Sequence, residues 1–370
     1  MQLLNNYKQR RSIWQTLHLD LPLLLLLLTI TIIGFFILYS ASNQQFGMIV
    51  QEIIHIGLAL ILMTLIAQLP PYIYERWTPW IYSIGIFLLF AVLIIGHIGK
   101  GAQRWLNLGL LHLQPSEIMQ LAIPMMLAWY YKNRHLPPKI KDIAVSAAII
   151  LVPVILTAKE PDLSTAITLT ISGACVLLFA GISWGLITGL FSLAIISIPL
   201  LWHFMHNYQR QRILVFLNPE RDPLGSGYHI IQSKIAIGSG GFFGKGWLMG
   251  TQSHLHFLPE HATDFIFAVG AEEFGLFGSL ILLTIYVLIT ARCIYIANHA
   301  QDTYTRLLAA SLSLMFFLSI FINIGMVTGI LPAAGLPLPL ISYGGSSMIA
   351  FMAGFGILMS IHGHKKLLRK

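Results

Sequence analysis

Charged residues are scarce in this sequence: Asp, Glu, Lys and Arg make up 10% of its 370 residues, whereas hydrophobic residues make up 56%. A water-soluble domain carries roughly 25% charged residues, so this composition excludes an ordinary soluble enzyme. The mean hydropathy of +0.76 indicates a polytopic membrane protein. The net charge of +8 does not indicate nucleic-acid binding, because most basic residues lie in short loops and at the termini.

Cysteine is also scarce. Cys175 and Cys293 both lie within or at the end of apolar stretches, without a partner in a polar loop. We therefore expect no disulfide framework. The apolar run Leu21–Leu38 follows several basic residues, as in a signal peptide. It is too long for a typical cleaved signal and lacks an A-x-A site, so we interpret it as a membrane anchor.

Long apolar runs, by contrast, are abundant. About twenty apolar residues are needed to cross the hydrocarbon core. Ten windows approach this length: Leu21–Ser40, Ile49–Gln68, Trp80–His97, Ile118–Tyr131, Ile143–Thr157, Ser164–Gly181, Trp184–Leu201, Phe265–Ile289, Leu307–Gly329 and Tyr343–Ile361. They predict an all-α membrane protein of about ten transmembrane helices, with residues 1–370 forming one domain.

The basic residues predict the orientation of these spans. With the N-terminus inside, 14 of the 22 Lys and Arg fall in inner segments and three in short outer loops. The other five lie in residues 203–263, and long loops are exempt from the positive-inside rule. Both termini are therefore predicted to be cytoplasmic. Residues 1–202 hold spans one to seven, 203–263 form one large extracytoplasmic loop, and 264–370 hold spans eight to ten.

Asp264 stands where this polar loop gives way to an apolar span. An ionisable residue at the edge of a membrane is costly and is a functional candidate by default. The alternative is a helix cap, because Asp is a preferred N-cap residue. We favour the functional interpretation, since basic residues of the loop could converge on this acid.

The loop carries five basic residues: Arg210, Arg212, Arg221, Lys234 and Lys245. An outward-facing enzyme has no nucleotide-activated substrate, so its donor must bring its own leaving group. A lipid-linked pyrophosphate sugar meets this need. Basic side chains, together with Arg104 in another outer loop, could hold the pyrophosphate through charge-assisted hydrogen bonds. Asp264 could take a proton from an attacking sugar hydroxyl.

The glycine-rich run Gly238–Gly246 is not a nucleotide-binding loop, because Ser239 and Gly246 depart from G-x-x-x-x-G-K-[ST]. Two interpretations stay open: a flexible or tightly turning loop, or backbone N–H groups that lie with Lys245 near a phosphate. The pair Glu52 and His55 has too few ligands for a metal. No metal site is predicted.

Several motifs resemble those of the SEDS (shape, elongation, division and sporulation) family of peptidoglycan polymerases, along nearly the whole chain. They are Lys100–Leu106, Gln114–Glu117, Pro161–Leu163, Tyr208–Arg212, Asp222–His229, Gln232–Gly241, Thr263–Ala268, Asn323–Pro332 and Pro339–Ser346. Any one of them alone would be weak evidence. Together they are highly specific.

The resemblance implies a glycosyltransferase of the bacterial inner membrane that serves cell elongation and rod shape. It would polymerise lipid II into β-1,4 glycan strands, with inversion at the anomeric carbon and undecaprenyl pyrophosphate as the leaving group. The essential acid falls on Asp264. The substrate-binding candidates are Arg104, Glu117, Arg210, Arg212, Lys234 and Lys245. The expected partner is a class B penicillin-binding protein. No cofactor is assigned, and a divalent cation such as Mg²⁺ stays open.

Three residues depart from the family pattern. Gln120 replaces a common Lys, so Glu117 must have another partner. His261 stands one position early, and Ser164 replaces a common Gly. Two other functions compete with the enzyme. A transporter of the lipid-linked precursor should carry polar groups through the bilayer, whereas here they gather on the outer side. A structural scaffold would give no reason for an acid at the lipid edge.

Overall fold

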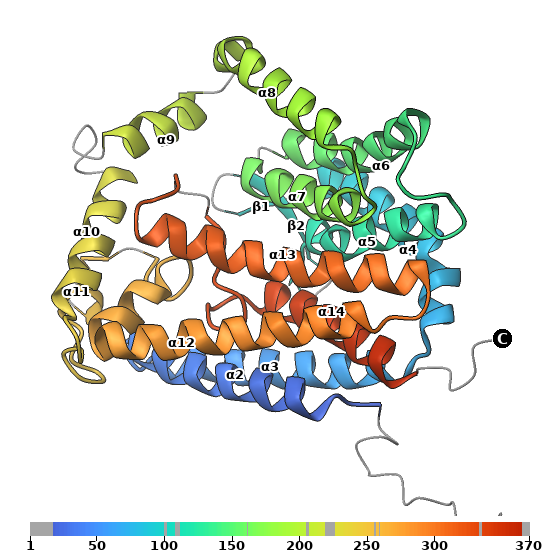
Figure 1. Cartoon of the computed structure of the whole chain (residues 1–370). Coiled ribbons are helices and arrows are strands. Elements are labelled where there is room, and N and C mark those ends of the chain that lie inside the picture. Colours follow the sequence, from blue (N-terminus) through green and yellow to red (C-terminus); the bar gives the residue numbers. More distant parts are fainter. Residues whose placement is uncertain are drawn as a thin grey trace, which may run out of the picture.

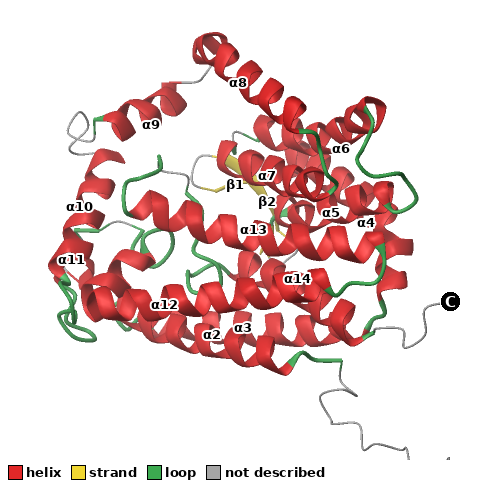
Figure 2. Cartoon of the chain, viewed as in Figure 1, coloured by secondary structure: helices red, strands yellow, loops and turns green. Residues whose placement is uncertain are grey.

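The computed structural model describes residues 18–99, 102–107, 112–160, 162–204, 207–218, 226–254, 257–258, 260–332 and 335–364. Figures 1 and 2 show a bundle of long helices. These are α2 (Leu21–Ala41), α3 (Phe46–Gln68), α4 (Pro71–Ile95), α5 (Pro115–Tyr131), α6 (Ile140–Lys159), α7 (Leu163–Phe179), α8 (Trp184–Phe204), α12 (Ile266–Asn298), α13 (Thr303–Val327) and α14 (Gly345–Gly363). Between α8 and α12 lie α9 (Asn207–Leu217), α10 (Ser226–Ser239) and the short α11 (Thr251–His254).

Each of the ten apolar windows lies on a helix of the bundle. Among the described residues, seven helices are long and apolar enough to cross a membrane: α2, α3, α4, α6, α12, α13 and α14. The α7 helix is also apolar but has only 17 residues. These helices confirm the predicted helical membrane fold. A helix suits lipid because it satisfies the hydrogen bonds of its own backbone.

A small antiparallel sheet between α4 and α5 was not predicted. It consists of β1 (His97–Gly99), β2 (Ala102–Asn107) and β3 (His112–Leu113), in the order β1-β2-β3. Strands of two to six residues are too short for their alternation to stand out in the sequence. Within the sheet, β2 carries Arg104.

The helices α13 and α14 form the centre of the bundle. Both are more buried than the surrounding spans, and α13 packs against α5, α7, α12 and α14. Figure 1 shows α13 running across the middle of the molecule. Their central position lets the segment between them reach the functional site.

One end of the bundle is marked by a buried ion pair. Arg292 of α12 donates to Asp20, with 2.6 Å between Nη2 and Oδ2, and Asp20 also caps α2 by accepting from the backbone of Leu23 at 3.0 Å. The same carboxylate lies 3.3 Å from His362. The pair fixes the relative height of α2 and α12 and gives a reference level for the rest of the bundle.

At the other end, α12 is broken at Gly275, whose φ of 66° is left-handed. An unbroken helix would join the N–H groups of Leu276 and Phe277 to the carbonyls of Glu272 and Glu273. Instead, the glycine-rich run supplies both sets of partners. Its residues 245 and 246 donate to the two carbonyls at 3.0 Å each, and its residues 241 and 242 accept from the two N–H groups at 2.9 and 3.0 Å.

Glycine is required at this break because two backbones approach closely. A Cβ on Gly244 would lie 2.1 Å from the carbonyl oxygen of Glu273, and one on Gly275 would lie 2.3 Å from the nitrogen of Gly244. Gly240 is equally close to the carbonyl of Ala271. The structure therefore agrees with a tightly turning loop as the role of the run.

Gly244→Ala is expected to destabilise the protein, because Gly244 has a φ of 79° and no room for a methyl group. A non-glycine residue in this region costs about 1–3 kcal/mol, before any clash. Gly238→Ala is the matched control, since a Cβ there meets nothing within 4 Å and lies in α10. Thermal unfolding should show a lower midpoint for Gly244→Ala alone. Equal midpoints would contradict this account.

Candidate functional site

A cavity of about 430 Å³ opens at the end of the bundle that carries Asp264. Its walls come from β2, the first turns of α5 and α7, the turn before α12, and the segment joining α13 to α14. The polar lining residues are Arg104, Gln114, Glu117, Gln120, Asp162, Ser164, Thr165, Thr168, Glu260, Thr263, Asp264, Ser319, Tyr343, Ser346 and Ser347. The predicted residues Arg104, Glu117 and Asp264 thus line one cavity although they are far apart in the chain.

Asp264 lies in a tight turn immediately before α12. Glu260 adopts a left-handed φ of 52°, and its carbonyl accepts from the backbone of Thr263 at 3.1 Å and of Phe265 at 3.2 Å. The N-cap of α12 is Phe265, without a side-chain cap. Asp264 is therefore not the helix cap that the sequence allowed as an alternative, and its carboxylate faces the cavity.

Three consecutive carbonyls of this turn are held by the α13–α14 region. The carbonyl of Ala262 accepts from the backbone of Tyr343 at 2.9 Å, and that of Thr263 accepts from the Ser342 hydroxyl at 2.6 Å. The carbonyl of Asp264 accepts from Nδ2 of Asn323 at 2.9 Å. We call this arrangement the carbonyl clamp. It fixes the backbone of Asp264 relative to the opposite wall of the cavity.

Asn323 is the central member of the carbonyl clamp. Its side chain is fully buried in α13, and Nδ2 also donates to the carbonyl of Leu336 at 2.6 Å. Asn323 belongs to one of the motifs that resemble the family, but no role was predicted for it. A polar side chain inside a long apolar span was the signal that could have singled it out.

Arg104 is positioned by Asp162, the N-cap residue of α7. Nη1 of Arg104 lies 3.1 Å from Oδ2 of Asp162, which also accepts from the Thr165 hydroxyl at 2.7 Å. Within the described part of the chain, Nε of Arg104 is buried without a hydrogen-bond partner. The side chain as a whole is 30% exposed and lines the cavity, so the guanidinium can be reached by a ligand.

Glu160 lies beside this pair and is almost fully buried. Burial raises its pKa to about 8; the neighbouring Asp162 adds to the rise and Arg104 opposes it. The ordinary pKa of this carboxyl is 4.5. The folded protein therefore holds a proton on Glu160 over a pH range in which the unfolded chain has released it.

Glu160→Gln is expected to alter how stability depends on pH. Between about pH 5 and pH 8, unfolding of the wild type releases the Glu160 proton, so its stability falls as the pH rises. Glutamine cannot ionise, so the free energy of unfolding of the variant should rise relative to that of the wild type over this range. Above about pH 8 the difference between the two should stay constant. Chemical unfolding at several pH values measures the difference. A difference independent of pH would contradict the raised pKa.

Glu117 is paired with a serine, since Gln120 cannot provide the positive charge of a lysine. The hydroxyl of Ser346 in α14 donates to Oε1 of Glu117 at 3.0 Å, and Gln120 lies 3.5 Å from the hydroxyl of Thr168. Ser164 lines the same cavity, so this departure from the family pattern lies at the site. A Cβ on Gly335 would be 3.6 Å from Oδ2 of Asp264 and 3.9 Å from the Ser164 hydroxyl. Glycine at 335 keeps this part of the cavity open.

Of the basic candidates in the segment 203–263, the three whose side chains are described, Arg210, Lys234 and Lys245, are not among the residues that line the cavity. Lys245 forms an ion pair of 2.6 Å with the buried Glu272, and Arg210 donates to the carbonyls of Trp202 and His203. Lys234 lies against Gly329 of the segment after α13. Arg212 belongs to α9, but its side chain lies outside the described residues, as does Arg221.

The described residues contain no group of three or more His, Cys, Asp or Glu side chains that could hold a metal ion. Two carboxylates of the cavity have protein partners: Asp162 accepts from Arg104 and Thr165, and Glu117 accepts from Ser346.

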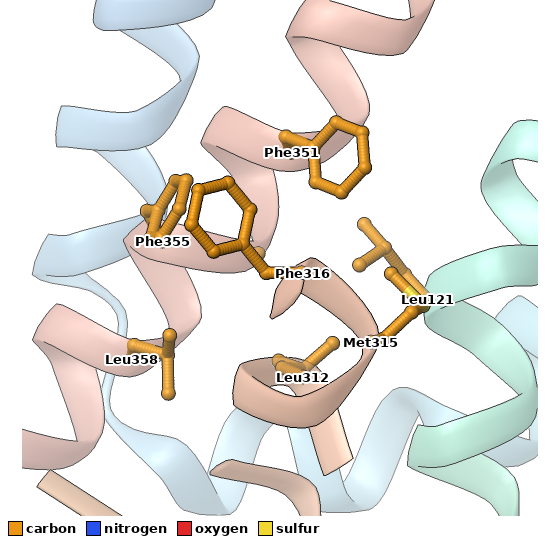
Figure 3. Close-up of a pocket in the computed structure, with 8 residues that line it drawn as sticks. Leu121, Leu312, Met315, Phe316, Phe351, Phe355 and Leu358 are labelled. Carbon is orange, nitrogen blue, oxygen red and sulfur yellow. The ribbon is translucent and has the colours of Figure 1, made fainter. Parts of the chain in front are cut away.

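Apolar side chains close the cavity towards the Arg292 end of the bundle. Phe351 lines the cavity and also a crevice of only about 10 Å³ between α5, α13 and α14. Figure 3 shows this crevice, walled by Leu121, Leu312, Met315, Phe316, Phe351, Phe355 and Leu358. The ring of Phe316 packs against Phe351 and Phe355 at centroid distances of 5.9 and 5.0 Å. So small an apolar space offers water no polar partner.

The apolar spans and the polar cavity at one end of them define a polytopic membrane protein with a site at the lipid–water edge. The family model for the FtsW, RodA and SpoVE proteins, described as cell cycle proteins, matches residues 20–367. The chain belongs to this family. The resemblance found in the sequence motifs is thereby confirmed.

Similar proteins include the peptidoglycan glycosyltransferase MrdB of Escherichia coli K12, which is 52% identical over 98% of both chains. The peptidoglycan glycosyltransferase RodA of Treponema pallidum is 31% identical, covering 94% of this chain and 98% of its own. Among solved structures, a chain of a peptidoglycan synthase complex that coordinates polymerization and crosslinking has a TM-score of 0.82 and 34% identity, covering 93% of this chain and 97% of its own. The crystal structure of Thermus thermophilus RodA has a TM-score of 0.71 at 29% identity, with coverage of 93% and 96%.

Proposed function

We propose that this chain is a peptidoglycan glycosyltransferase that polymerises lipid II during cell elongation and rod-shape maintenance, with Asp264 as the general base. The observation that carries the proposal is the cavity that brings Asp264, Arg104 and Glu117 together. Membership of the family and the names of relatives such as MrdB support the activity. The cavity supports the assignment of residues.

In the proposed reaction, the C4 hydroxyl oxygen of the acceptor sugar attacks the anomeric carbon of the donor. The new glycosidic C–O bond forms as the bond from that carbon to the pyrophosphate breaks, with inversion. Asp264 takes the hydroxyl proton, and undecaprenyl pyrophosphate leaves with the bonding electrons. Arg104, held by Asp162 and partly exposed in the cavity, offsets the charge on the leaving pyrophosphate.

A general base must lie within hydrogen-bond reach of the proton that it removes. The carbonyl clamp supports this role for Asp264, because it fixes the backbone from which the carboxylate reaches into the cavity. Glu117 and Ser346 shape the opposite wall. Arg210, Arg212, Lys234 and Lys245 stay proposed substrate contacts, and in the structure described here Lys245 would first have to leave Glu272.

The orientation forms part of the proposal. In a bacterial inner membrane with both termini in the cytoplasm, the cavity opens to the outer side, where lipid II presents its sugars. We propose that α5, α7 and α8 also cross the membrane, giving ten spans with residues 203–263 outside. A divalent cation such as Mg²⁺ fits this cavity as part of a substrate complex, since Mg²⁺ commonly binds through one or two carboxylates plus substrate phosphates.

The proposed partner is a class B penicillin-binding protein that crosslinks the new strand, in keeping with the solved complex that couples polymerization and crosslinking. The competing function is transport of the lipid-linked precursor. The apolar crevice below the cavity favours an enzyme, because a transporter needs a polar path through the bilayer.

One experiment tests the function. Purified protein and partner are given lipid II in vesicles, and products are resolved by gel electrophoresis while movement of lipid II between leaflets is followed separately. We expect glycan polymer and no change in the rate of leaflet exchange. Exchange without polymer would identify a transporter. The absence of both polymer and exchange would favour a scaffold.

A further inference from the structure

The loop Gly240–Met249, which joins α10 to α11, carries an apolar surface that the proposed reaction does not use. Phe242 and Phe243 are 73% and 85% exposed, and Met249 is 66% exposed. A contiguous exposed apolar surface marks a site of contact with a protein or a membrane. These three side chains are therefore candidates for such a contact.

The loop is fastened to the outside of two spans. Its backbone pairs with the break in α12, where Phe242 accepts from the N–H of Phe277. On α2, the indole of Trp247 donates to the carbonyl of Phe36 at 3.1 Å and packs edge-on against its ring. Phe277 and Phe36 are themselves exposed on these helices. The apolar surface of the loop therefore continues that of the two spans.

The depth of these contacts can be counted from the Asp20–Arg292 ion pair. Phe277 is fifteen residues from Arg292 along α12, and Phe36 is sixteen residues from Asp20 along α2. At 1.5 Å per residue, both contacts lie about 22–24 Å from the ion pair. A hydrocarbon core is about 30 Å thick. Charged groups are costly in hydrocarbon, so the ion pair is expected at the edge of the core. Counted from that edge along either helix, the loop contacts fall within the thickness of the core, in its half nearer the cavity.

The polar groups of the loop are suited to this level. Its backbone makes seven hydrogen bonds with other backbone groups: two within the loop, one with α10 and four with α12. The charge of Lys245 is neutralised by Glu272, which also accepts from the backbone and hydroxyl of Thr251. Irregular backbone is tolerated at membrane depth only where its polar groups are satisfied.

We propose that the loop Gly240–Met249 is a re-entrant segment whose side chains Phe242, Phe243 and Met249 contact the acyl chains of the leaflet on the Asp264 side. The occupant is phospholipid hydrocarbon. The loop thereby anchors the segment 203–263 in the membrane, and it does so whether or not Asp264 is the catalytic base.

The test is a depth measurement on Phe243→Cys carrying a nitroxide, with one chain per phosphatidylethanolamine–phosphatidylglycerol nanodisc and no lipid-linked sugar. Phe87→Cys, on the exposed face of α4, is the hydrocarbon control, and Gln45→Cys, exposed between α2 and α3, is the aqueous control. The unmutated chain checks background labelling, since Cys175 and Cys293 are buried.

We expect oxygen to relax the label at Phe243→Cys more strongly than a water-soluble nickel chelate, with a ratio close to that of Phe87→Cys. A ratio matching Gln45→Cys would place the loop in water and overturn the proposal. A label shielded from both reagents would mean that protein covers the loop, which would also overturn it. Phe243 is so exposed that its replacement should leave the fold unchanged.

Discussion

Asp264→Asn should lower the rate of glycan polymerisation by about 10²–10⁴-fold, the usual contribution of a general base. Asparagine has nearly the same shape, and the carbonyl clamp holds the backbone of residue 264 rather than its side chain. The fold should therefore persist while the proton acceptor is lost. Polymerisation of lipid II by the purified protein with its partner measures the rate, and thermal unfolding checks the fold.

Glu260→Gln is the matched control, because Glu260 lines the same cavity four residues earlier. We expect a much smaller loss from this change, since its carboxylate accepts from the Thr263 hydroxyl within the turn. If Asp264→Asn polymerised at the wild-type rate while Glu260→Gln did not, the base would be Glu260. Polymerisation by both variants at the wild-type rate would remove the base from this turn.

Asn323→Leu is expected to lower kcat by about 100-fold with little change in KM. Leucine has the same number of side-chain heavy atoms and the same branching, but it leaves the carbonyls of Asp264 and Leu336 without their donor. A displacement of the base by about 1 Å is enough for such a loss. Unpaired buried polar groups should also reduce the free energy of unfolding by about 1–3 kcal/mol each. Steady-state kinetics and chemical unfolding measure the two effects.

Ser311→Ala separates positioning from stability. Ser311 is fully buried in the same helix, and among the described residues its hydroxyl bonds only to the carbonyl of Leu308 in that helix. This variant should lose some stability and keep its kcat. If Asn323→Leu raised KM instead of lowering kcat, Asn323 would act on substrate binding, and the interpretation of the clamp would fail even with Asp264 as base.

Hydropathy was a good guide to the helices, because lipid demands long apolar segments whatever their partners. It placed a window on each of the ten long helices, yet it began the third at Trp80 although α4 starts at Pro71. The residues Tyr72 to Arg76 are polar enough to read as a loop. Packing and a proline at the first turn extend the helix through them.

The site was only partly accessible from the sequence. Asp264 was predicted because charge at a membrane edge is costly, Arg104 because a basic residue could hold a pyrophosphate, and Glu117 from the family resemblance. The three residues do share a cavity. The sequence could not predict that Lys245 would pair with Glu272, because that contact depends on the break at Gly275. Asn323 is a polar residue inside an apolar span, but no local pattern predicts that it and Ser342 bond to the turn that carries Asp264.

The apolar packing around Phe316 and Phe351, which closes the cavity towards the Arg292 end of the bundle, also matters for the cell's energy supply. A bacterial inner membrane sustains a voltage, and each charge that crosses it releases about 2.3 kcal/mol per 100 mV. An acid-lined chamber that reached both faces would leak protons down this gradient. Aromatic rings fill the bundle beneath the chamber. In the proposed reaction, the proton that Asp264 takes therefore returns to the side from which the substrate came. The protein can therefore make glycan continuously without discharging the membrane that holds it.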